Sequence, residues 1–395
     1  MDINEIISRK FDIFQEELCS QNDRINEEIE SSSFLVIGGA GTIGQAVVKE
    51  LFSRSPSRLH VVDISENNLV ELVRDIRSSF GHNSTEFDVF AIDAGSSEFD
   101  SYLRAQPAFD YVLNLSALKH VRSEKDPYTL LRMTNVNIIN TIKLQEYCEE
   151  IGAKKYFCVS TDKAANPANL MGASKRIMEI FLMQNQATVP VSMARFANVA
   201  FSDGSLLHGF NYRIQKRQPI SAPNDIKRYF ITAQEAGRLC VLSCLLGGNN
   251  EIFFPNHHSE ITLQKFSNIA ESYLRNLGLI PVRYQSEAAA RSAIENLDLN
   301  KEWPCYFFNS DTTGEKLYEE FYTETESLDL DRMINIGVIK NDRTFNNDMC
   351  NVFLEEYYRL CKQSNPKKDM FVELYKILLP YLEHEERNKN LNDRM

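Results

Sequence analysis

A glycine-rich turn between an apolar run and a helical pattern constrains the fold of this chain more than any other feature. Residues Phe34–Ile37 form a short apolar run, which the sequence GGAGTIG (residues 38–44) and the helical pattern AVVKELF (46–52) follow at once. Such glycines permit a tight turn, let the backbone approach a pyrophosphate, and let the helix pack closely against the strand. The helix N-terminus adds free N–H groups for phosphate oxygens. The pattern therefore predicts a dinucleotide-binding strand–turn–helix unit.

A second expected strand supports the same reading. It covers residues 59–62 and ends at Asp63, nineteen residues after Gly44, where a carboxylate is suited to bind the adenosine ribose hydroxyls. Ile64 and Ser65 follow instead of an arginine, which favours NAD over NADP. The alternative is a glycine turn in an α/β protein that binds no dinucleotide.

The alternation of strands and helices continues through the first half of the chain. Further strands are expected at 87–92, 111–115, 156–159 and 191–195, and helices at 69–78, 127–150 and from residue 170. This order predicts an α/β protein with a Rossmann-type doubly wound parallel sheet. Asp93, after the third strand, is expected near the adenine. Ligands of such sheets bind outside the carboxyl ends of the strands.

The regular alternation ends near residue 200, and this divides the chain. We expect an N-terminal helical segment (1–32), an NAD-binding domain (33–200), a smaller α/β substrate-binding region (201–325) and a helical C-terminal extension (326–395). Apolar residues at helical spacing support one N-terminal helix: Ile6, Ile7, Phe11, Phe14 and Leu18. Basic stretches at 211–218 and 227–230 indicate an anion site near the sheet rim, or else two solvated faces.

Composition excludes several classes of protein. A net charge of −12 argues against a nucleic-acid binder, and the apolar runs are too short to span a membrane. The acidic, amphipathic N-terminus is not a signal peptide. Eight cysteines without a CxxC pair favour free thiols in a reducing cytoplasm. No zinc-like spacing occurs, so no metal is expected, and the pair His257–His258 is expected at the surface.

The stretch 159–176, VSTDKAANPANLMGASKR, carries the candidate chemistry. Thr161 ends an expected strand, and Asp162 and Lys163 place an acid and a base at the mouth of the sheet. Met171 and Lys175 are four residues apart and share a helix face. On spacing alone, Asp162 and Lys163 could be a surface ion pair and Met171 a core residue.

Several motifs together resemble a known family. They are the glycine turn, ALKHV at 117–121, the 160–176 block, RFANV at 195–199 and RYF at 228–230. Over roughly 33–320 they resemble the extended short-chain dehydrogenase/reductases, and within these the nucleotide-sugar 4,6-dehydratases that act on UDP-N-acetylglucosamine. The segment SDTTGEK (310–316) and the longer tail resemble the soluble members of legionaminic-acid-type pathways.

One departure from the superfamily is informative. The usual Tyr-x-x-x-Lys pair is replaced here by Met171 and Lys175, and a thioether cannot act as a base. Because the rest of the block is intact, we expect that another residue acts as the base and that the site is catalytically active. A similar methionine occurs in the branch that retains the configuration at C5, so the resemblance implies retention.

The resemblance also implies an internal redox cycle with NAD as cofactor. Hydride leaves C4 of the sugar, water is lost across C5 and C6, and hydride returns to C6. In this scheme Thr161 bonds the C4 oxygen, Asp162 is the acid at C6, Lys163 is the base at C5, and Lys175 holds the nicotinamide ribose.

The resemblance and the glycine pattern assign further residues to the two ligands. The residues expected at the cofactor are Gly38, Gly41, Thr42, Ile43, Gly44, Asp63, Asp93, Ala117 and Lys175. Those expected at the nucleotide sugar are Lys119, Asn198, Arg228, Glu315 and Lys316, with Asn198 and Arg228 at the diphosphate. His120 is expected to pack against its loop.

Three alternatives remain open. The same dehydration could act on a GDP-linked sugar. The protein could be a nucleotide-sugar epimerase or reductase, although those reactions rely on the tyrosine that Met171 replaces. It could also be a catalytically silent NAD-binding regulator. The helix at 127–150 and the helix after Met171 resemble the pair at the four-helix dimer interface of the superfamily, so a homodimer or higher homo-oligomer is expected.

Overall fold

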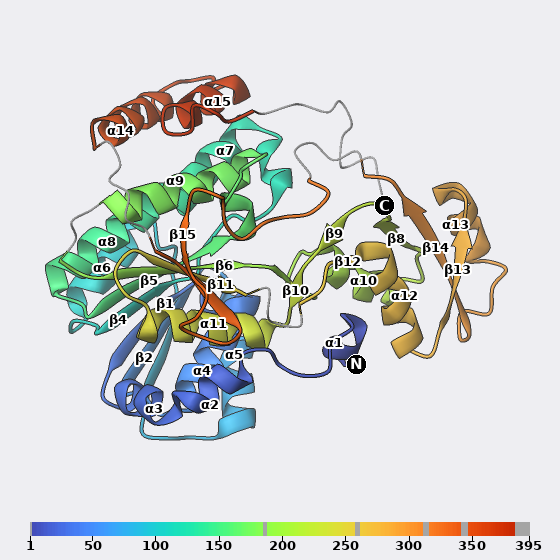
Figure 1. The fold of residues 1–395 in the computed structure, drawn as a ribbon, viewed down its shortest axis with the longest axis horizontal. Helices are drawn as coiled ribbons and strands as arrows, with labels where there is room; N and C mark the ends of the chain where they lie inside the picture. Colours follow the sequence, from blue (N-terminus) through green and yellow to red (C-terminus); the bar gives the residue numbers. More distant parts are fainter. Residues whose placement is uncertain (1, 185–187, 257–260, 311–315, 341–346, 384–395) are drawn as a thin grey trace.

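A nine-stranded sheet forms the centre of the computed structural model, which describes residues 2–184, 188–256, 261–310, 316–340 and 347–383 (Figure 1). Its strand order is β15-β16-β11-β6-β5-β4-β1-β2-β3. The strands are β1 (Ser33–Ile37), β2 (Arg58–Asp63), β3 (Glu86–Ala91), β4 (Tyr111–Asn114), β5 (Lys155–Thr161), β6 (Val191–Phe196), β11 (Glu251–Pro255), β15 (Ser327–Asp329) and β16 (Ile336–Lys340). From β11 to β3 all neighbours run parallel, whereas β16 and β15 are antiparallel. The predicted fold class is confirmed.

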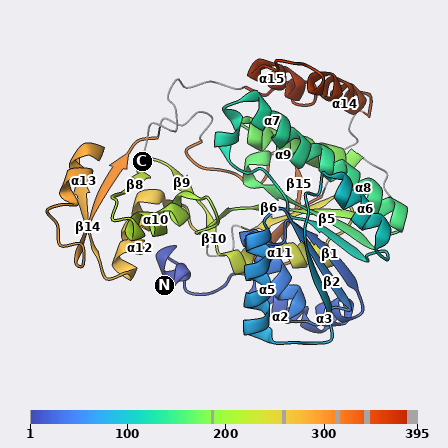
Figure 2. The same cartoon turned by 180° about the vertical axis from the view of Figure 1, so that it is seen from behind.

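Helices cover both faces of this sheet (Figures 1 and 2). One face carries α4 (Thr42–Phe52), α5 (Glu66–Phe80) and α11 (Ala233–Leu246), and the other carries α6 (Ser97–Ala105), α8 (Asn140–Ile151) and α9 (Leu170–Gln184). Strands such as β1 are buried along their whole length, because a parallel sheet is covered on both faces. This is why the central strands read as continuous apolar runs.

A smaller lobe lies beside the carboxyl end of the sheet. Its parallel three-stranded sheet has the order β13-β14-β8. The elements are β8 (Ile220–Pro223), β13 (Ile280–Tyr284), β14 (Glu302–Phe308), α10 (Leu206–Gln215), α12 (Phe266–Asn276) and α13 (Glu287–Ala293). Two short ribbons connect it to the main domain: β7 (Asn198–Val199) with β10 (Phe230–Ile231), and β9 (Lys227–Arg228) with β12 (Gln264–Lys265).

The N-terminal segment is not the single helix that its periodicity predicts. It forms α1 (Ile3–Ile6), α2 (Gln15–Ser20) and α3 (Asn22–Glu30), and Ser8, after α1, has a φ of +59°. Ile6 and Ile7 pack into the small lobe, whereas Leu18 packs into the core of the main domain. A straight helix could not reach both cores, and Phe11, predicted on the apolar face, is exposed.

The region expected to bind substrate is interleaved with the main domain. After the first part of the small lobe the chain returns through α11 to β11, which pairs parallel to β6. Residues 327–329 and 336–340 form strands rather than helix, because the free edge of β11 is paired by β16 and then β15. Within this region, α12 begins at Phe266, directly after β12.

Two helices near the C-terminus, α14 (Asn347–Cys361) and α15 (Lys368–Lys376), lie over α7 (Pro127–Thr134) and α9 (Figure 1). The rings of Phe181 and Phe353 meet edge to face at 5.6 Å, and the Tyr375 hydroxyl lies 2.9 Å from the hydroxyl of Thr134. The predicted helix 127–150 contains a π-helical turn, η2 (Asn135–Ile139), between α7 and α8. Because the chain's own helices cover α9, the prediction that α9 forms a dimer interface is wrong. A homodimer stays a prediction and would need another surface.

The cysteines and helices bear on two other expectations. All eight cysteines are free thiols; Cys19 and Cys361 are exposed and the other six are buried. Among the residues described, no helix combines the length and the apolar character that crossing a bilayer requires.

Candidate active site

A cleft of about 450 Å³ opens at the carboxyl ends of β1, β4, β5 and β6, where ligands of doubly wound sheets bind. The main domain and the small lobe both line it. The structure brings most of the predicted site residues to this cleft: Gly38, Gly41, Thr42, Ile43, Gly44, Ala117, Lys119, Thr161, Asp162, Lys163, Met171, Lys175 and Asn198.

The glycines of the turn are needed for two different reasons. Gly38 has a φ of +75°, and a Cβ there would lie 2.7 Å from the backbone nitrogen of Ser116. A Cβ on Gly44 would overlap the Gly38 carbonyl oxygen. A Cβ on Gly41 would meet nothing closer than that same oxygen at 3.7 Å. The fold thus requires glycine at 38 and 44, whereas glycine at 41 keeps open the space beside the N-terminus of α4.

The two carboxylates predicted for the adenosine half bond to backbone. Asp63 accepts hydrogen bonds from the N–H groups of Ala40 and Ser65, each at 2.9 Å, and so anchors the glycine turn. Asp93 accepts from the N–H of Gly95 at 2.9 Å and lies 3.6 Å from Arg132. Neither residue lines the cleft, and their contacts with a dinucleotide stay predictions.

The acid and base predicted at the end of β5 lie side by side in the cleft. A 3-10 turn, η3 (Asp162–Ala164), begins directly after Thr161 and turns both side chains inward. One oxygen of Asp162, Oδ1, accepts from Lys163 Nζ and from the Thr161 hydroxyl, each at 2.9 Å. Because the side chain of Asp162 is only 3% exposed and that of Lys163 19%, this is not a surface ion pair.

The start of α9 is fixed by two capping side chains. Asn169 Oδ1 accepts from the N–H of Gly172 at 2.8 Å, and Glu124, from η1 (Val121–Glu124), accepts from that of Met171 at 2.9 Å. Burial raises the pKa of Glu124, and the hydrogen bonds from the α9 backbone oppose this. These contacts hold the face of α9 that carries Met171 and Lys175 against the cleft.

Met171 and Lys175 share the predicted face. Lys175 is buried, its Nζ lies 3.1 Å from Met178 Sδ, and burial lowers its pKa. The Met171 side chain is also buried and offers no proton to a ligand. The position that usually carries a tyrosine in this arrangement is therefore chemically inert here.

A buried ionic network lies next to the site. Glu179 accepts from Arg195 at 2.7 and 2.9 Å, from Arg176 at 2.9 Å and from the Ser160 hydroxyl at 2.6 Å. Glu326 pairs with both arginines. Burial alone would raise the pKa of Glu179, but the arginines and Ser160 lower it to about 2. The network joins α9 to the ends of β5 and β6.

The predicted substrate residues divide into two groups. Lys119 and Asn198 line the cleft, and Lys119 is exposed at its rim. Arg228 is buried and donates to the carbonyl oxygens of Lys316 at 3.0 Å and Leu317 at 3.3 Å, so the structure does not bring it to the cleft. Lys316 lies 4.0 Å from Glu319 and also outside the cleft. Glu315 lies outside the described residues, as do the rest of 311–315 and the pair His257–His258.

Sequence reasoning missed several residues at this site. Glu319 is buried, and one of its carboxylate oxygens lies 3.7 Å from the guanidinium of Arg228. Burial and the charge of Asp162 raise the pKa of Glu319, whereas the charge of Lys163 lowers it. In the sequence it is only one of several acidic residues between 319 and 326, so no signal marked it. The small lobe adds an apolar wall through Leu206, Leu207, Phe230 and Phe266.

His120 also belongs to the cleft wall. A Cβ on Gly204 would lie 2.8 Å from its ring, so the histidine packs against that turn. Beyond it a second hollow of about 720 Å³ continues along α10, where Tyr212 and Arg213 line it. The two hollows share His120, Gly204, Ser205 and Leu206.

Comparisons with known proteins agree with this architecture. The family model described as "Polysaccharide biosynthesis protein" matches residues 34–341. An uncharacterized membrane protein of Methanocaldococcus jannaschii is 29% identical, over 80% of this chain and 87% of its own. A protein named UDP-N-acetylglucosamine 4,6-dehydratase (inverting), from Campylobacter jejuni, is 28% identical over 62% of this chain and 72% of its own. The chain spans only 47% of the length of two longer bacterial relatives.

Among solved structures, Pen from Bacillus thuringiensis has the same fold. It superimposes with a TM-score of 0.64 at 20% identity, covering 83% of this chain and 98% of its own. The fold of this chain is therefore shared with that structure.

Proposed function

The chain belongs to the polysaccharide biosynthesis protein family, and from that premise we propose that it is an NAD-dependent nucleotide-sugar 4,6-dehydratase acting on UDP-N-acetylglucosamine. The observation that carries the proposal is the Asp162–Lys163 pair, which places an acid and a base in one cleft with a dinucleotide turn. Elimination of water needs a base at one carbon and an acid at the next. The name of the Campylobacter relative supports the same reaction class.

The residues present fit a nicotinamide dinucleotide. Gly41 keeps open the space in front of the α4 N-terminus, where backbone N–H groups favour phosphate oxygens. Lys175 lines the cleft on the far side, where a nicotinamide ribose would lie. When bound, NAD supplies the hydride acceptor and donor that the oxidation at C4 and the reduction at C6 need.

Thr161 compensates for the missing tyrosine in this proposal. Its hydroxyl donates to Asp162 at 2.9 Å, so it can pass the C4 hydroxyl proton to that carboxylate. Met171, at the tyrosine's place, cannot take this proton. Asp162 then holds the proton that the C6 hydroxyl needs to leave as water.

Lys163 acts at C5. Its neutral amine takes the C5 proton, which the C4 ketone has made acidic, while Asp162 gives its proton to the leaving hydroxyl. The elimination leaves a protonated lysine beside a carboxylate, 2.9 Å apart. Lys163 returns the proton to C5 as hydride reaches C6, and both residues recover their starting forms. The C4 proton ends in the released water, so the protons balance.

Proton NMR in D₂O tests the proposal directly. Purified protein with UDP-N-acetylglucosamine should give a 6-deoxy methyl signal, a 4-keto or hydrated product, and deuterium at C5. We further propose retention at C5, because Met171 marks the retaining branch, although the Campylobacter relative is named as inverting. The coupling constants of the C5 proton in H₂O distinguish the two outcomes. If UDP-N-acetylglucosamine is unchanged, the same experiment is repeated with the GDP-linked sugar.

Variants assign the roles. Lys163→Met and Asp162→Asn should lower kcat by roughly 10²–10⁴-fold, the usual contribution of a positioned acid or base. Lys301→Met, which removes an exposed lysine far from the cleft, should leave kcat unchanged. Turnover by Lys163→Met near the wild-type rate would contradict the assignment. Conversion to a C4 epimer would favour an epimerase, and bound NAD without turnover on either sugar would favour a regulator.

A further inference from the structure

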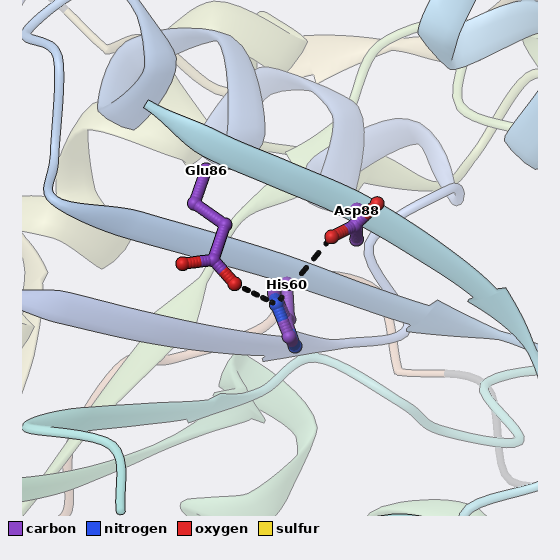
Figure 3. Close-up of side chains that lie close together, drawn as sticks. All are labelled: His60, Glu86 and Asp88. Carbon is purple, nitrogen blue, oxygen red and sulfur yellow. Dashed lines mark ion pairs between the residues drawn. The ribbon is translucent and has the colours of Figure 1, made fainter. Parts of the chain in front are cut away.

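A cluster of one histidine and two carboxylates lies at the edge of the main sheet, away from the cleft. His60 belongs to β2 and Asp88 to the edge strand β3, and the two are direct partners in the parallel register. Glu86 precedes Asp88 by two residues and therefore projects from the same face of β3. Figure 3 shows the imidazole pointing toward both carboxylates.

The three ligand atoms are spaced as a metal ion requires. His60 Nε2 lies 3.7 Å from Glu86 Oε1 and 3.9 Å from Asp88 Oδ2, and all three atoms lie within 4.8 Å of one another. Two atoms each about 2.0–2.2 Å from a tetrahedral zinc ion lie roughly 3.3–3.6 Å apart. Small rotations of the two exposed carboxylate side chains would close the difference.

The histidine supplies an independent observation. Its side chain is 3% exposed, and among the residues that the structure describes Nε2 has no hydrogen-bond partner. Buried polar atoms nearly always have a partner, so an ordered one that faces two carboxylates needs an explanation. The other ring nitrogen, Nδ1, lies 2.8 Å from the Tyr102 hydroxyl, and a hydrogen bond to this nitrogen fixes the orientation of the ring, as is usual for histidines that bind a metal.

We propose that His60, Glu86 and Asp88 bind a divalent cation of the zinc class, with water completing the coordination. One imidazole nitrogen and two carboxylate oxygens suit Zn²⁺ or Co²⁺ better than Mg²⁺ or Ca²⁺, which prefer oxygen alone. The cation would join β3, the unsupported edge of the sheet, to β2. The site is thus structural in character.

An ion pair explains the cluster less well. At 3.7 and 3.9 Å both carboxylates are beyond hydrogen-bond distance. Arg58, opposite Glu86 in the register, donates from its guanidinium to the carbonyl oxygens of Pro107 and Ala108, and within the described part of the chain it forms no ion pair with Glu86 or Asp88.

Metal titration of the full chain tests the proposal. After treatment with a chelator, the protein is titrated with Co²⁺, followed by its visible absorption, and separately with Zn²⁺, followed by calorimetry. We expect one Co²⁺ per chain with the strong visible bands of a low-coordinate site, displacement of Co²⁺ by Zn²⁺, and a higher Tm with Zn²⁺.

Two double variants make the test specific. Glu86→Gln with Asp88→Asn changes only exposed side chains, so the fold should persist, and the affinity should fall by at least roughly tenfold. Glu98→Gln with Asp100→Asn removes the same charge from exposed positions of the neighbouring helix α6 and should bind as the wild type does. Absence of saturable Co²⁺ binding in the wild type, or equal affinities of the two double variants, would overturn the proposal.

Discussion

Replacing Glu179 by glutamine tests whether the ionic network beneath the cleft stabilises the fold. The carboxylate is 0% exposed and accepts hydrogen bonds from two arginines and from Ser160. Glutamine keeps the shape but removes the charge, and Arg195, itself fully buried, would then have Glu326 as its one ionic partner among the described residues. Breaking a buried pair by removing one partner typically costs about 3–5 kcal/mol.

The pKa of Glu179 gives a second route to the magnitude. Folding lowers this pKa from the usual 4.5 to about 2. Since a tenfold change in proton affinity corresponds to about 1.4 kcal/mol, the ionised carboxylate stabilises the fold by roughly 3 kcal/mol. The two routes agree on a decrease of about 3 kcal/mol in the free energy of unfolding of Glu179→Gln at pH 7.

The pH dependence has a definite sign. Because the folded-state pKa is the lower one, the stabilisation is fully present above pH 4.5 and is lost as the pH falls toward 2. The gap between wild type and Glu179→Gln should therefore shrink from roughly 3 kcal/mol at pH 7 to roughly 1.5 kcal/mol at pH 3.

Urea unfolding followed by circular dichroism at both pH values measures this gap. The control is Glu356→Gln, which breaks an exposed pair with Arg359 on α14 and should change stability by less than about 0.5 kcal/mol. A Glu179→Gln protein within about 1 kcal/mol of the wild type at pH 7, or a gap that does not shrink at pH 3, would refute the reasoning.

Two further predictions concern the glycine turn and the C-terminal helices. Gly41→Ala should leave Tm unchanged, because its Cβ meets nothing in the fold closer than 3.7 Å, but it should lower the NAD content of the purified protein. Gly44→Ala should lower Tm, because its Cβ would overlap the Gly38 carbonyl oxygen. Equal Tm values of the two variants would contradict this. Phe353→Ala should destabilise the protein by about 3–5 kcal/mol in urea unfolding, because the ring is fully buried against Phe181, whereas the exposed Tyr358→Ala serves as its control.

The parallel strands β1 to β6 of the central sheet could be predicted from the sequence because each of them carries its own signal. The run ending at Ile37 is continuously apolar, as a strand buried on both faces must be, and a glycine turn follows it. Residues 59–62, before Asp63, are apolar except for His60, and all four are buried. Asp162 and Lys163, in the 160–176 block, could be predicted to lie together because they are neighbours in the chain. Features that depend only on neighbouring residues in the chain can be predicted from the sequence.

Features that depend on distant partners could not be predicted. β15 and β16 are strands because β11 offers a free edge, and this pairing joins segments about 80 residues apart in the chain. The basic stretch containing Arg228 indicated an anion site, yet carbonyl groups near residue 316 bury that side chain. Likewise, His60 meets Asp88 only through the register of two strands, which no local pattern specifies.

The cover that α14 and α15 form over α9 has a consequence for how the protein is made. α9 is synthesised long before these two helices, and its side chains toward Phe353 and Tyr375 are apolar. At roughly 5–20 residues per second, translation leaves that face uncovered for on the order of 10–30 seconds. During this interval the nascent chain exposes the apolar face of α9 that α14 and α15 later cover. We therefore expect the ribosome-bound chain to present an apolar face of the kind that chaperones bind until α14 and α15 emerge.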